Sequence, residues 1–330
     1  MSSQITPKIS EFIEILKKNN SLTSIIEKEE FSSKILQDLK SNLVTQNTKA
    51  SVEINKLAKL TQQLDNRSNP VFAFLMNSLF LWDLQYLYKL KNWLNSNQGE
   101  LKNWFDSVNE MEVFISLSNF HYNHPDFCLP NISTHTILET KEIGHPLLNA
   151  ESRIDNNFEL NGLQEFVIIT GANMAGKSTF LRTIGTNLVL AMSGTKVCAS
   201  EFNFSPLPLF TSMRTSDSLS DNESYFYSEL KRLQLIVEKL KKGEKLFIIL
   251  DEILKGTNSK DKAEGSKKFV KQLLKYEAAG IIATHDLSLC SVKDEHPEKI
   301  QNHYFDVEIE NDQLVFDYKL KPGICSNMNA

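Results

Sequence analysis

The chain has 330 residues, a formal net charge of −5 and a hydrophobic fraction of 41%. This length is enough for two domains, each with its own core. The acidic balance excludes a basic surface over the whole chain, so any DNA contact must come from local patches or a partner. The N-terminal stretch MSSQITPKIS has no secretory signal pattern, and the four cysteines are widely spaced. We therefore expect reduced thiols in a cytoplasmic protein.

The first part of the chain has apolar residues at helical spacing. Ile9, Phe12, Ile13 and Leu16 form one such stripe, and few glycines occur before residue 120. These features predict amphipathic helices packed around a common core. The turn formers LDNRSNP end one long helix, and Pro70 suits the first turn of the next.

The most membrane-like segment is VFAFLMNSLFLWDLQYLYKL, residues 71–90, which contains Asn77, Asp83 and Gln85. A spanning helix needs about 20 residues almost free of such polar groups. We therefore predict a buried helix here and no membrane contact.

The pattern changes near residue 137. Short β-branched and aromatic runs occur at 166–169, 246–250 and 280–283, and polar turn residues follow each run. Alternation of such runs with helical patterns predicts parallel strands joined by crossover helices. The residues around Glu310 to Asp312 alternate like an antiparallel hairpin. We predict a mostly helical domain over 1–136 and an α/β domain with a mixed sheet over 137–330.

The stretch TGANMAGKSTFLRTIG follows the apolar run at 166–169 and satisfies G-x-x-x-x-G-K-[ST]. Its glycines let backbone N–H groups surround phosphate oxygens at a helix N-terminus. Lys177 is expected to reach the β- and γ-phosphates of a nucleoside triphosphate, and the Ser178 hydroxyl to ligate magnesium. The predicted nucleotide-binding residues are Gly171, Ala172, Asn173, Met174, Ala175, Gly176, Lys177, Ser178 and Thr179.

Two further groups follow later strands. Asp251 and Glu252 end the run LFIILDE, where Asp251 would hold Mg²⁺ and Glu252 would activate the attacking water. The strand GIIATHD carries His285 to its carboxyl end, the edge at which doubly wound sheets bind ligands. His285 is therefore expected to stabilise or sense the γ-phosphate.

Taken together, TGANMAGKSTFLRTIG, LDEILKGTNSKD and ATHDLSL resemble the ATPase domain of the MutS mismatch-repair family, a relative of the ABC-type P-loop ATPases. The segments LDNRSNPVFAFLMNSLFLWDL and EIGHPLL resemble the helical core domain before it. The resemblance implies a homodimer with two composite ATP sites acting on DNA. In each site one subunit supplies the phosphate loop and the other a serine, here Ser224 in SDNESYFYSELKRL. It also implies that Asn173 orients a phosphate or the water, and that 256–261 cross the dimer interface.

This chain departs from the family pattern in three places. A mismatch-recognition domain with its Phe-x-Glu wedge does not fit in this length, and Phe12-Ile13-Glu14 lies in a helical stripe. The arms that encircle DNA are reduced to about the first 65 residues. Arg153 stands where MutS proteins commonly stack an aromatic residue on adenine.

The sequence therefore predicts a magnesium-dependent ATPase of the MutS type whose dimer rearrangement acts on DNA. One alternative is a nucleotide-gated dimerisation module with little hydrolysis, against which the presence of Glu252 argues. Another is an ABC-type ATPase that does not act on DNA, which the absence of an LSGGQ-like segment disfavours.

Overall fold

The computed structural model describes residues 6–44, 48–66, 69–213, 225–254, 259–310 and 313–325. It separates into two compact units, Met1–Asn119 and Phe120–Ala330. The second unit begins earlier than the boundary expected after residue 136. Residues before 137 belong to the second unit because β1 (Asn131–Ile132) pairs in parallel with β5 (Glu201–Phe204) of that unit.

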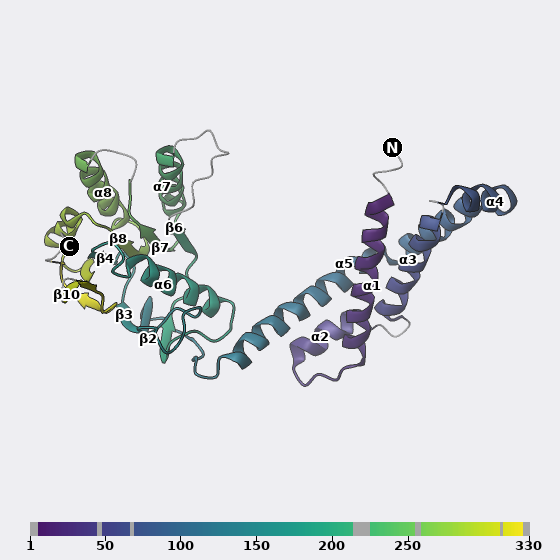
Figure 1. Cartoon of the computed structure of the whole chain (residues 1–330), viewed down its shortest axis with the longest axis horizontal. Helices are drawn as coiled ribbons and strands as arrows, with labels where there is room; N and C mark the ends of the chain where they lie inside the picture. Colours follow the sequence, from purple (N-terminus) through teal and green to yellow (C-terminus); the bar gives the residue numbers. More distant parts are fainter. Residues whose placement is uncertain are drawn as a thin grey trace. The chain divides into compact units, whose positions relative to one another are not determined.

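The first unit is helical (Figure 1). Its helices are α1 (Thr6–Lys28), α2 (Lys34–Leu43), α3 (Ala50–Asp65), α4 (Pro70–Phe80) and α5 (Trp82–Asn123). Helices α1 and α3 pack on each other, and the core between the helices includes Leu16, Ile54, Trp93 and Trp104. Ile13 is buried as the stripe predicts, but Phe12 is 45% exposed and lies outside that core.

Helix α4 starts as predicted but is not buried. The Asn69 side chain accepts hydrogen bonds from the N–H groups of Val71 and Phe72, and Pro70 occupies the first turn. None of the residues of α4 is buried, and Phe74 is 74% exposed. The prediction of a buried helix was wrong because apolar content favours burial without supplying a surface to pack against. Among the described residues, no helix combines the length and apolarity needed to cross a membrane.

The described residues of the second unit form two sheets and a small hairpin. The described part of the larger sheet has the order β12-β9-β4-β8-β7-β6, and the smaller one has the order β1-β5-β2-β3. The strands of the larger sheet are β4 (Phe166–Gly171), β6 (Leu209–Ser212), β7 (Leu246–Asp251), β8 (Ala278–Ala283), β9 (Ile300–Phe305) and β12 (Leu320–Pro322). The smaller sheet adds β2 (Leu138–Ile143) and β3 (Asn156–Leu160).

The strand directions agree with the sequence pattern. Strands β9, β4, β8, β7 and β6 are parallel to their neighbours, and β12 runs antiparallel at the edge. The predicted hairpin is formed by β10 (Glu308–Glu310) and β11 (Gln313–Val315). The remaining helical elements are α6 (Lys177–Met192), α7 (Tyr225–Lys241), α8 (Ser259–Leu273), η3 (Leu287–Ser291) and α9 (Val292–Glu295). The fold is therefore mixed α/β, as predicted.

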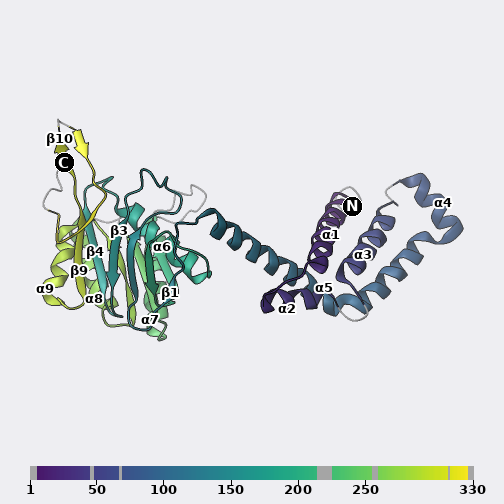
Figure 2. The ribbon, with the colours of Figure 1, turned by 90° about the horizontal axis from the view of Figure 1, so that it is seen from below.

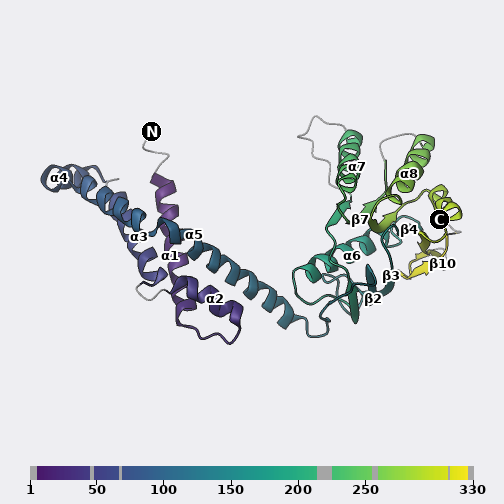
Figure 3. The same cartoon turned by 180° about the vertical axis from the view of Figure 1, so that it is seen from behind.

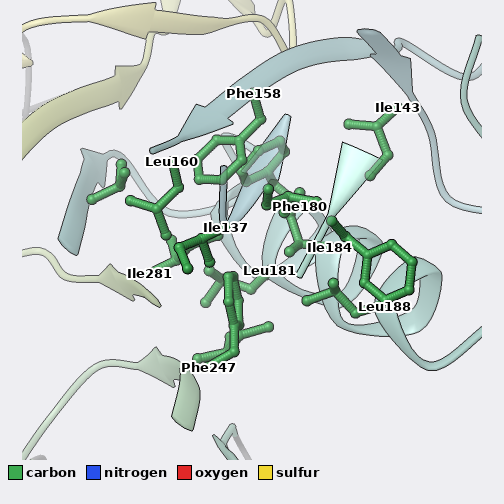
Figure 4. Packing of buried hydrophobic residues seen from close by; sticks show 14 of the residues in the cluster. Ile137, Ile143, Phe158, Leu160, Phe180, Leu181, Ile184, Leu188, Phe247 and Ile281 are labelled. Atoms are coloured by element: carbon green, nitrogen blue, oxygen red, sulfur yellow. The ribbon is translucent and has the colours of Figure 1, made fainter. Parts of the chain in front are cut away.

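Each face of the larger sheet has its own core because successive strand residues point to opposite faces. One face packs with α6 and the smaller sheet, and Figure 4 shows Phe180, Leu181 and Ile184 among the side chains gathered there. On the other face, Ile248 and Leu250 pack with residues of α7 and α8. Figure 2 shows the strands side by side with α6 against them. Buried on both faces, the parallel strands read as continuous apolar runs.

We predict that Gly280→Ala destabilises the second unit by about 2–3 kcal/mol through overpacking. A Cβ at this position of β8 would lie 1.9 Å from the Ile248 carbonyl oxygen of β7, a backbone atom that cannot move aside alone. Urea unfolding measures the effect. The control is Gly185→Ala on α6, where the added Cβ meets Ile249 at an ordinary 3.4 Å. Equal stability of the two variants would contradict the close approach of β7 and β8.

Candidate functional site

A glycine-rich loop joins β4 to α6, as the sequence predicts. Gly171 has φ 145° and Gly176 has φ 107°, values that L side chains rarely adopt. A Cβ on Gly171 would also lie 2.5 Å from the Phe305 carbonyl oxygen. Gly176 is the N-cap of α6 and no side chain caps the helix. The N–H groups of the first helical turn therefore face the loop and suit an anion.

Lys177 lies inside this loop and is only 6% exposed. Its Nζ donates hydrogen bonds of 2.7 Å to the carbonyl oxygens of Gly171 and Ala172. The ammonium group is thus held over the beginning of the loop, next to the helix N-terminus. This arrangement gathers positive charge from the side chain and from the helix dipole in one place.

Strand register brings the acidic groups to the same edge of the sheet. Ile169 pairs with Ala283, and Ala283 pairs with Asp251, so the ends of β4, β8 and β7 lie in one row. Asp251 is 6% exposed, and its Oδ2 accepts a 2.8 Å hydrogen bond from Ser178 Oγ. The loop serine and the strand-end carboxylate are therefore in direct contact.

Glu252 follows Asp251 with a left-handed φ of 57°. Its N–H donates to the Ala283 carbonyl oxygen at 2.9 Å, which extends the β7–β8 pairing by one residue. Its Oε1 lies 2.8 Å from His285 Nε2. The carboxylate and the imidazole orient each other, as a base and its positioning partner would.

These groups open into a single pocket of about 670 Å³ within the second unit. A pocket of this size suits a small-molecule ligand or cofactor. The predicted residues that line it are Asn173, Met174, Gly176, Lys177, Ser178, Thr179, Asp251, Glu252, His285 and Arg153. Two other predicted residues of the loop, Ala172 and Ala175, are buried. Ser224 and residues 256–258 lie outside the described residues, so their predicted roles stay predictions.

The pocket lining also contains residues that the sequence reasoning missed. His145, Asn156, Phe305 and Tyr318 come from β3, β9 and loops far apart in the chain. Burial lowers the pKa of His145, and the nearby Arg182 cation lowers it further, so this ring is neutral at pH 7. No local motif marks these residues, because only the folded chain brings them together.

Arg153, by contrast, was singled out from the sequence. Its Nε donates a hydrogen bond to Asp155 Oδ1 at 2.6 Å, and its Nη2 donates one to Asp155 Oδ2 at 3.1 Å. This two-point pairing fixes the guanidinium plane in the pocket wall. The hydrogen bond to Asp155 also raises the pKa of Arg153, so the cation persists at any physiological pH.

Asn187 of α6 is completely buried and links this helix to the segments around Gly144 and Cys198. Its Nδ2 donates to the carbonyl oxygens of Gly144 and Thr183, at 3.0 and 2.9 Å. Its Oδ1 accepts the Cys198 N–H at 2.7 Å. A single side chain thus satisfies three backbone groups from three segments, two of which border the pocket wall.

The oxygen donors at the site suit magnesium. Mg²⁺ takes oxygen ligands and is commonly held by one or two carboxylates together with substrate phosphates. Ser178 Oγ and Asp251 Oδ2 are such donors, and they already lie side by side at the pocket wall. Among the described residues there is no cluster of three or more His, Cys, Asp or Glu side chains. The donor set therefore fits a cation that shares its coordination with a bound ligand rather than a cage made only of protein groups.

We expect Asn187→Ala to lower the free energy of unfolding by about 3 kcal/mol, because the buried Gly144 carbonyl oxygen and Cys198 N–H lose this hydrogen-bond partner. Urea unfolding gives the value. The control is Val189→Ala on the same helix, where the side chain is 50% exposed and the change should stay within about 0.5 kcal/mol. A loss for Asn187→Ala no larger than that of the control would contradict its linking role.

Comparison with known proteins identifies one family. Residues 167–329 match the family of MutS domain V. "MutS protein homolog 4" of Homo sapiens is 30% identical over 68% of this chain and 24% of its own length. "DNA mismatch repair protein MutS" of Thermotoga petrophila is 31% identical over 57% of this chain and 24% of its own length. The protein of that name from Methanococcoides burtonii is 28% identical over 69% of this chain and 26% of its own length.

The chain thus spans about a quarter of the length of these relatives. The matched region contains the glycine-rich loop, Asp251, Glu252 and His285. On these grounds the chain belongs to the MutS family.

Proposed function

We propose that this chain is a P-loop ATPase of the ABC type that binds ATP with Mg²⁺ in the pocket of the second unit and hydrolyses it. The observation that carries the proposal is the convergence of three strand ends. The glycine-rich loop after β4, the acidic pair after β7 and His285 after β8 all line one pocket. A glycine turn without a ligand would not require a buried lysine and two carboxylates beside it.

In this proposal the loop binds the triphosphate. The N–H groups at the start of α6 surround the phosphate oxygens, and Lys177 neutralises charge on the β- and γ-phosphates. To do so its Nζ must exchange the Gly171 and Ala172 carbonyl oxygens for phosphate oxygens. Asn173 and Thr179 lie along the same wall and provide further polar contacts.

Ser178 and Asp251 would hold Mg²⁺, which when bound supplies charge stabilisation at the phosphate oxygens. Glu252 would take the proton from the attacking water, and its contact with His285 orients it for that step. His285 lines the same pocket, where it would contact the γ-phosphate. Each group thus has a position that matches its proposed task.

We extend the proposal to a homodimer that acts on DNA, with Ser224 and the segment 256–261 contributed across the subunit interface. The support is membership of the MutS family, whose relatives include proteins named for DNA mismatch repair. The free cysteines of the described chain support a cytoplasmic setting. ATP turnover measured with and without duplex, mismatched and branched DNA tests this extension, and turnover insensitive to every DNA would favour an ABC-type ATPase that does not act on DNA.

Lys177→Ala should abolish tight ATP binding, because it removes the cation that faces the β- and γ-phosphates. Calorimetric titration with Mg²⁺ and ATP measures the loss. The control is Lys242→Ala, which removes an exposed lysine after α7 and should leave the affinity unchanged. Undiminished affinity in Lys177→Ala would refute the proposed phosphate loop.

Glu252→Gln should keep ATP binding and slow hydrolysis by about a hundredfold or more, because the amide cannot accept the proton of the water. Phosphate release under saturating ATP gives the rate, with Glu277→Gln, an exposed carboxylate before β8, as the control. If the wild-type chain binds ATP but shows no more turnover than Glu252→Gln, the chain is a nucleotide-gated dimerisation module instead.

A further inference from the structure

Glu229 is a buried carboxylate outside the pocket. It lies on α7 with 8% exposure, and its Oε1 accepts a 2.8 Å hydrogen bond from the Leu254 N–H. Helix α7 contacts β6 and, in Figure 3, lies next to the end of β7; it supplies none of the described pocket-lining residues. A carboxylate loses much of its hydration when it is buried, so a buried one calls for an explanation from its contacts.

The contact is made at an unusual turn. Glu252 has φ 57° and Leu254 has φ 59°, so two residues with side chains adopt the left-handed conformation within three positions. This conformation is unfavourable for L residues, and it persists only where surrounding contacts hold it. The turn is held at both ends, by the bond from Glu252 N–H to Ala283 and by the bond from Leu254 N–H to Glu229.

We propose that Glu229 is a positioning residue for hydrolysis, an inference that rests on the proposed ATPase function. By holding Leu254, it keeps the turn in the conformation that points Glu252 toward His285 and the pocket. Displacement of a reacting group by about 1 Å can cost about a hundredfold in rate. Helix α7 also directly follows the segment that contains Ser224, so Glu229 ties that helix to the turn that carries the proposed base.

Three variants separate positioning from a general structural role. Glu229→Asp keeps the charge but is one methylene too short to reach Leu254, whereas Glu229→Gln keeps an acceptor oxygen at the right distance. We expect Glu229→Asp to lower kcat by about ten- to a hundredfold with the Kd for Mg²⁺–ATP within about twofold of wild type. Glu229→Gln should restore kcat to within about threefold. Glu238→Asp, on the exposed face of the same helix, is the matched control.

Hydrogen exchange of the Leu254 amide, followed in peptides or by NMR, is a second readout that does not depend on activity. It should speed up at least about tenfold in Glu229→Asp and return toward the wild-type rate in Glu229→Gln. A Glu229→Asp chain with wild-type kcat, or a Glu229→Gln chain as impaired as Glu229→Asp, would overturn the positioning role. If the wild-type chain shows no ATP turnover, the ATPase proposal is refuted, and the positioning role with it. The hydrogen-exchange rate of the Leu254 amide would still show whether Glu229 holds that amide.

Discussion

The parallel register of β4, β8 and β7 is the constraint on which the candidate site depends. Parallel strands end at the same edge of a sheet, and the pairing of Ile169 with Ala283 and of Ala283 with Asp251 aligns the three ends in one row. A shift of one residue in either pairing would turn Asp251 to the opposite face and break its contact with Ser178. The buried apolar residues on both faces fix this register, so the core of the unit also sets the geometry of the site.

Backbone conformations that are unfavourable in isolation concentrate around the same row. Met174 and Glu252 have left-handed φ values of 65° and 57°, and both line the pocket. Such residues cost free energy that the surrounding packing must offset. Both residues follow a strand of the larger sheet, at the edge where the candidate site lies.

The sequence predicted the part of the site that is encoded locally. The loop from Gly171 to Ser178, the acidic pair and His285 each follow an apolar strand, and parallel pairing then brings them together. Asn187 and Tyr318 could not be found in this way, because their partners are distant in sequence, as in the bond from Asn156 Nδ2 to the Tyr318 carbonyl oxygen. Helix α4 was predicted to be buried because its own residues are mostly apolar. Burial also requires a second surface that packs against the helix, and the sequence of α4 alone does not reveal whether one exists.

The charges in the pocket explain why the proposed nucleotide would need a divalent cation. Asp251 and Glu252 place two carboxylates beside Lys177, while the charge of Arg153 is already engaged by Asp155. Under the proposed function, a triphosphate would add negative charge to a pocket that already contains both carboxylates. Lys177 alone could not offset that charge. Ser178 Oγ and Asp251 Oδ2, which lie 2.8 Å apart, would then both be available as oxygen ligands of that cation. Cation binding and phosphate binding would therefore be coupled, because the cation would offset the charge that the phosphates add beside the two carboxylates.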